Sequence, residues 1–121
     1  MSAFRCDHDY HVHTSLSTCS ADPAMSAEAI AAFAADAGYA EVCFTDHLWD
    51  GDVPGASDWY RPQDLPHVRA LLPLPACAAP RLLFGCEVEY MGGDRLTLTR
   101  PHFDLFDLVV IPVTHMHSRG Y

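Results

Sequence analysis

The sequence predicts an α/β fold with parallel strands. Segments typical of strands alternate with segments typical of helices, so that four strands are separated by three helices. The last strand, residues 107–113 (DLVVIPV), is a near-continuous apolar run, as expected of a strand buried on both faces. Side chains that can bind metal follow the strands, and the carboxyl ends of parallel strands are where such folds build their sites.

The first part of the chain contains two of the strands and one helix. Residues 9–13 (DYHVH) alternate between faces, as a strand does. Alanine dominates residues 26–38, with Ser26 as a suitable N-cap and Gly38 at the expected helix end. Residues 41–46 (EVCFTD) are rich in aromatic and β-branched side chains and predict the second strand.

The remaining elements follow a long loop. Residues 48–66 hold several glycines and prolines, and a loop of that length in a compact domain is usually functional. We expect a short helix at 66–72, a third strand at 81–88 and another short helix at 99–106, before the fourth strand at 107–113.

Composition narrows the class of protein. The 121 residues suffice for one domain. Half of the residues are hydrophobic and 19% are charged, which indicates a globular chain. Sixteen acidic residues face seven basic ones, all arginine, for a net charge of -9. This acidity argues against a nucleic-acid partner and against a polybasic membrane anchor, and no apolar run approaches the roughly 18 residues of a membrane span.

Cysteine usage predicts the compartment. The number of cysteines is odd, their spacing is irregular, and there is no CxxC pair: Cys6, Cys19, Cys43, Cys77 and Cys86. The N-terminal residues have no apolar core of the kind found in signal peptides. We therefore expect free thiols and a reducing cytoplasm.

Candidate metal ligands follow all four predicted strands. One His is usually a surface residue, but agreement between four strand ends favours a metal site, with His11, His13, His47, Glu87 and His115 as its candidate ligands. His11 and His13 are two apart and face the same way. With Glu87 they form a set of two imidazoles and one carboxylate, which suits Zn, Mn or Fe and leaves positions for water and substrate.

Other polar residues near these strands have two possible roles. Asp9 and Asp46 are candidates to orient a ligand from outside the coordination sphere, and a solvated carboxylate is the alternative for each. His8, His67 and His102 lie away from the predicted strand ends, so we expect them at the surface.

Four motifs in order resemble the PHP superfamily, which is named for polymerase and histidinol phosphatase. They are DYHVHT at 9–14, TDH at 45–47, GCEVE at 85–89 and VTHMH at 113–117. HxH alone is a weak signal, whereas HxH, DH, GxE and a late His in this order are specific, and the resemblance covers roughly residues 7–118. It implies a distorted (β/α)7 barrel that holds up to three metal ions and hydrolyses phosphoesters.

The resemblance also implies a role for each ligand. It assigns the first metal to His11 and His13, both the first and second to Glu87, the second to His115, and the third to His47; Glu87 and His115 are the catalytic candidates. The position six residues after the second His of HxH is usually His or Asp in the family, but here it is Cys19. Cysteine binds Zn as a thiolate, and a buried apolar thiol is the alternative.

We therefore expect residues 1–121 to be a single partial PHP domain, comprising the first four strands of the barrel. The family's further His and its late Asp-x-His pair follow the fourth strand and are not among these residues. The expected function is histidinol-phosphatase-like hydrolysis of a small phosphorylated substrate by a metal-activated water. The alternative is a truncated remnant that binds metal without catalysis. A half-barrel would also expose strand edges and so favour self-association.

Overall fold

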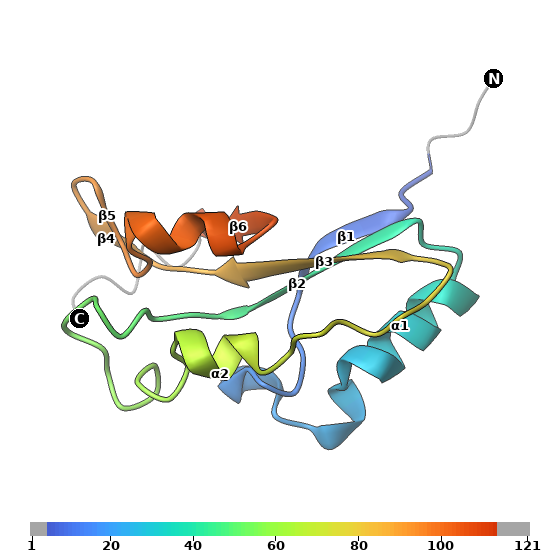
Figure 1. Ribbon diagram of the computed structural model, residues 1–121, viewed down its shortest axis with the longest axis horizontal. Helices are drawn as coiled ribbons and strands as arrows, with labels where there is room; N and C mark the ends of the chain where they lie inside the picture. Colours follow the sequence, from blue (N-terminus) through green and yellow to red (C-terminus); the bar gives the residue numbers. More distant parts are fainter. Residues whose placement is uncertain (1–4, 114–121) are drawn as a thin grey trace.

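Four parallel strands form the sheet in the computed structural model, which describes residues 5–113 (Figure 1). The sheet curls like half of a barrel, as the sequence predicted. Its order is β1 (His8–Val12), β2 (Glu41–His47), β3 (Arg81–Glu87) and β6 (Leu108–Val110). Sequence order and spatial order agree, as expected when each strand is followed by a crossover to the next.

Helical segments connect the strands. After β1 the chain forms the short 3-10 segments η1 (Thr18–Ser20) and η2 (Pro23–Met25), and then α1 (Ala27–Asp36). The Ser26 hydroxyl accepts a hydrogen bond from the Ala29 N–H at 3.1 Å, which caps α1 as the sequence predicted. α2 (Leu65–Arg69) precedes β3, and Figure 1 shows α1 and α2 on the same side of the sheet. None of the helices in the described part of the chain is long and apolar enough to cross a membrane.

One expectation for the last third of the chain is confirmed and another was wrong. The short helix expected at 99–106 is present as the 3-10 helix η3 (Arg100–Leu105). The strand expected at 107–113 is only three residues long and half-buried, rather than buried on both faces. Within residues 5–113 it pairs with a single strand, β3, so no described strand pairs with its outer edge.

A small antiparallel hairpin was not expected from the sequence. Its strands are β4 (Tyr90–Gly92) and β5 (Arg95–Leu96). Gly92 and Gly93 both have positive φ, at 98° and 61°, which favours glycine. The Gly-Gly pair was the signal for this turn, but strands this short carry too little alternation to be recognised.

The register between β2 and β3 aligns their functional ends. Thr45 pairs with Gly85 and His47 pairs with Glu87 in a continuous parallel ladder. Side chains of β3 alternate between the two faces of the sheet. Phe84 therefore joins the apolar cluster packed beneath the helices, whereas Glu87 points to the opposite face. The helices therefore cover one face of the sheet and leave the other for the polar strand ends.

Gly85 allows β2, β3 and β6 to approach closely. A Cβ atom at this buried position would lie 2.6 Å from the backbone oxygen of Leu108 and 2.7 Å from the sulfur of Cys43. One of those contacts is backbone and the other belongs to a fully buried side chain, so neither neighbour can move aside cheaply.

Gly85→Ala is expected to lower the free energy of unfolding by about 1–3 kcal/mol because it overpacks this junction. The matched control is Gly51→Ala, since a Cβ at Gly51 meets nothing within 4 Å. Urea denaturation of both variants measures the difference. Equal stability of the two variants would show that the strands tolerate a wider spacing at Gly85.

Candidate metal centre

The carboxylate of Glu87 is the centre of the site. Only 1% of this side chain is exposed, at the carboxyl end of β3. Three imidazoles surround it: His11 Nε2 lies 2.8 Å from Oε1, while His13 Nε2 and His47 Nδ1 lie 3.1 Å and 2.8 Å from Oε2. The sequence placed these four residues at strand ends, and the structure brings their side chains together.

The contact between His13 and Glu87 is close without meeting the geometry of a hydrogen bond. His13 Nε2 and Glu87 Oε2 are both buried, and neither has a hydrogen-bond partner despite their 3.1 Å separation. Orphaned polar atoms are rare inside proteins and need an explanation. A spacing of about 3 Å is that of neighbouring ligand atoms around one ion bound at roughly 2.0–2.2 Å. The donor set therefore fits a divalent cation.

Electrostatics keep Glu87 in the form that binds metal. Burial raises the pKa of the Glu87 carboxyl, but the imidazoles of His13 and His47 outweigh burial and hold its pKa well below the ordinary range. An ionised carboxylate with imidazole neighbours is the ligand set that suits Zn, Mn or Fe.

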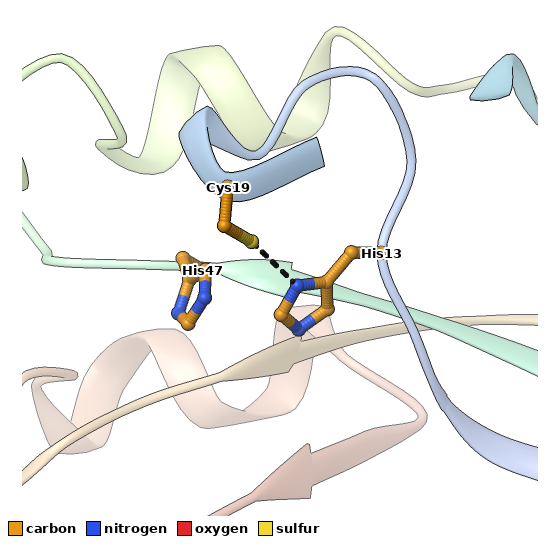
Figure 2. Close-up of side chains that lie close together, drawn as sticks. All are labelled: His13, Cys19 and His47. Atoms are coloured by element: carbon orange, nitrogen blue, oxygen red, sulfur yellow. Dashed lines mark hydrogen bonds between the residues drawn. The ribbon is translucent and has the colours of Figure 1, made fainter. Parts of the chain in front are cut away.

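A second group of potential ligands shares His13. His13, Cys19 and His47 each offer one ligand atom within 4.8 Å of the others. Figure 2 shows Cys19 on η1 directed at the ring of His13, with His47 beside it. The sulfur of Cys19 lies 3.2 Å from His13 Nδ1, so His13 faces Glu87 with one nitrogen and Cys19 with the other. His115, also predicted as a ligand, lies outside the described residues.

Asp46 holds the loop that carries Cys19. Its buried carboxylate accepts hydrogen bonds from the N–H and hydroxyl of Thr14, at 2.7 and 2.8 Å, and from the hydroxyl of Ser17 at 2.7 Å. Ser17 Oγ in turn accepts from the backbone N–H of His47 at 3.1 Å. Asp46 thus orients the site indirectly, by holding the backbone segments that carry the ligands. Asp9 accepts from the backbone N–H of His11 at 3.0 Å and likewise makes no described contact with an imidazole.

The long loop after β2 supplies an aromatic wall. Trp59 and Tyr60 lie 5.1 and 6.1 Å from His47, measured between ring centroids. The Tyr60 hydroxyl donates a 2.6 Å hydrogen bond to Glu89, a buried carboxylate just beyond β3. Trp59 remains 39% exposed, so part of this side chain is open to solvent beside His47.

A second buried cluster was missed in the sequence. The carboxylate of Asp50 accepts hydrogen bonds from His102 Nδ1 at 2.6 Å and from the hydroxyl of Thr99 at 2.8 Å. His102 was expected at the surface, but this contact makes it half-buried; His67 is also half-buried, because its Nε2 lies 2.7 Å from the Leu16 carbonyl. Asp50 and His102 are 52 residues apart, so no local pattern marks them as partners.

Acid is expected to weaken the Asp50 cluster. Burial raises the pKa of Asp50, but hydrogen bonds from His102, the Asp52 N–H and Thr99 outweigh it and hold its pKa below the usual value. A carboxyl whose pKa is lower in the folded state stabilises the fold above its unfolded pKa, near about 3.9, and loses that contribution as the pH falls through its folded pKa.

Asp50→Asn is therefore expected to cost about 1–3 kcal/mol of unfolding free energy at pH 7. The difference from wild type should shrink below pH 4. Urea denaturation across this pH range measures it, with the exposed Asp36→Asn as the control that changes little. A difference that stays constant down to pH 3 would contradict the role given to the ionised carboxylate.

Fold and side chains together define a class of protein: a metal-binding α/β domain with its ligands at the ends of parallel strands. The PHP domain family model matches residues 9–120, so the chain belongs to the PHP domain family. This match confirms the resemblance found in the motifs. The search of curated proteins found no match.

His13→Ala is expected to remove most of the bound metal, because His13 faces both groups of ligands. The affinity of the purified chain for Zn²⁺ or Mn²⁺ should fall by more than about tenfold, since even partners outside the coordination sphere are typically worth 10–100-fold. Metal analysis after dialysis measures the content. The control is His8→Ala, an exposed histidine that contacts Asp7. Equal metal in wild type and His13→Ala would overturn the site.

Proposed function

We propose that this chain carries the metal centre of a PHP-type phosphoesterase. Its substrate is a small phosphorylated molecule, as in histidinol-phosphatase-like members of the family. The observation that carries the proposal is the convergence of His11, His13 and His47 on the buried carboxylate of Glu87. Family membership supports a metal-dependent hydrolase in general, and the phosphoester is our more specific inference.

Each residue has a defined part in this proposal. His11 and His13 would hold the first ion together with Glu87, whose two oxygens lie 2.8 and 3.1 Å from their Nε2 atoms. The resemblance implies that Glu87 would also bind the second ion. As the resemblance implies, His115 would bind the second ion, and His47 and Cys19 would bind the third. Zn, Mn or Fe, when bound, lowers the pKa of a coordinated water and offsets charge on the phosphate.

The surroundings of the centre suit an anionic substrate. The chain carries a net charge of -9, but bound cations are the largest local charges in such a site and so outweigh a distant acidic surface. Trp59 and Tyr60 form an aromatic wall beside His47 on one side of the site.

Hydrolysis of p-nitrophenyl phosphate by the metal-depleted chain, with Mn²⁺ or Zn²⁺ added back, tests this function. We expect little turnover from residues 1–121, because the family's late ligands are not among them and a displacement of about 1 Å in an active site already costs about a hundredfold. A longer form that includes those ligands should be active, and Glu87→Gln should abolish its activity. Turnover that survives Glu87→Gln, or that needs no metal, would contradict the proposal.

The alternative is a PHP remnant that binds metal without turnover. The observation that favours it is that the described ligands come from β1, β2 and β3 and the loops that follow them. These ligands are only part of the set that the family uses. Metal binding by the wild-type chain, together with an inactive extended form, would support this alternative. A reading frame that continues into His and Asp-x-His motifs would instead favour the enzyme.

Self-association through the open sheet edges is part of the proposal. β1 and β6 each pair with one strand within residues 5–113, and unpaired edges favour contact with a second copy. Size-exclusion chromatography with light scattering should show a dimer or larger species. A stable 13.3 kDa monomer would contradict it.

We place the protein in a reducing cytoplasm, in keeping with its five free cysteines.

A further inference from the structure

We infer that Cys19 makes the third-ion position of the proposed centre selective for zinc, whereas the ligands around Glu87 also accept manganese or iron. The inference rests on the proposed function, which gives the third ion to Cys19 and His47. The juxtaposition behind it is a thiol on η1 beside two imidazoles: one ligand atom each from His13, Cys19 and His47 lies within 4.8 Å of the others (Figure 2).

The sulfur of Cys19 lies within reach of an ion in this group. Around a tetrahedral zinc ion, neighbouring nitrogen and sulfur ligands are about 3.5 Å apart, so shifts of about 1 Å bring the sulfur and the His47 imidazole onto one ion. Cys19 is exposed, so its side chain has room for this adjustment and an ion can reach it from solvent. Its sulfur already lies 3.2 Å from His13 Nδ1, at the edge of the imidazole cluster.

The two groups of ligands differ in their donor chemistry. The first combines imidazoles with the carboxylate of Glu87, an oxygen donor that suits manganese and iron as well as zinc. The group that contains Cys19 and His47 has no carboxylate, and the oxygens of Asp46 are directed instead at the loop after β1. A thiolate is a soft ligand, which favours zinc and suits the harder manganese ion poorly.

Cys19 is the cysteine whose sulfur faces an imidazole. Cys43 and Cys86 are fully buried in the sheet, where an ion from solvent cannot reach them. The sulfurs of Cys6 and Cys77 lie beside nearby backbone carbonyls. A sulfur–metal bond at the centre would therefore come from Cys19.

The backbone on both sides of Cys19 is held in place. The N–H of Thr18 donates to the side chain of Gln63 at 3.1 Å, and the hydroxyl of Ser20 donates to the Thr14 carbonyl at 2.6 Å. Gln63 is itself only 1% exposed. These hydrogen bonds keep the thiol beside the imidazoles, so a bound ion meets sulfur in a position that is largely preformed.

Co²⁺ reports directly on a bond to sulfur. We expect the metal-depleted wild-type chain, with its thiols kept reduced, to bind Co²⁺ with the intense near-ultraviolet absorption of a sulfur–cobalt bond, and added Zn²⁺ to remove this band. Cys19→Asp, which introduces a residue that the family usually has, should bind Co²⁺ without the band. The control, Cys6→Ala, removes an exposed thiol outside the site and should keep it.

The outcomes of this experiment separate the inference from the proposed function. Co²⁺ bound by wild type without the band, or a band that persists in Cys19→Asp, would overturn the inference alone. Failure of wild type to bind any Co²⁺ would instead overturn the metal centre.

Dialysis against Zn²⁺ and Mn²⁺ tests the division between the two groups. We expect Cys19→Asp to lower zinc affinity by at least about tenfold and to leave manganese affinity unchanged or higher, because oxygen replaces sulfur. Glu87→Gln should lower manganese affinity and keep the sulfur–cobalt band. Equal losses of both ions in each variant would overturn the inference, since the two groups would then act as one unselective site.

Discussion

A carboxylate as deeply buried as that of Glu87 is stable only when nearby groups replace the hydration it has lost. Three imidazoles do so, and all three come from other strand ends or the loops beyond them. The His13 imidazole approaches the carboxylate closely but without a hydrogen bond. A cation bound between the two groups would therefore give both polar atoms a partner. The relative positions of β1, β2 and β3 therefore determine the geometry of this cluster.

Two features of the sheet set the distances within the cluster. The first is Gly85, whose missing side chain lets β2 and β6 approach β3, two residues before Glu87. The second is the buried carboxylate of Asp46, which binds Thr14 and Ser17 and so fixes the turn after β1. Gly85 in the GCE motif and Asp46 in the TDH motif thus have structural roles, in addition to the ligands that these motifs contain.

Loops far apart in the sequence close the site from outside. The Trp49 N–H donates to the Gln63 carbonyl at 2.8 Å, and the Asp50 N–H donates to the Thr97 carbonyl, also at 2.8 Å. The Asp50–His102 pair then ties the loop after β2 to η3, ahead of the last strand. These contacts give the long 48–66 segment a defined shape, so that Trp59 and Tyr60 can wall the centre.

Local patterns in the sequence were enough to predict the parallel α/β fold, the four strands and the places where metal-capable residues lie along the chain. Periodicity and end-of-strand position are properties of neighbouring residues, so His11, His47 and Glu87 could be found without coordinates. The meeting of Cys19 with His13, the Asp50–His102 pair and the short, half-buried β6 were decided by tertiary structure. Each depends on loop conformation or strand coverage, which bring together residues whose separation along the chain leaves no periodic trace.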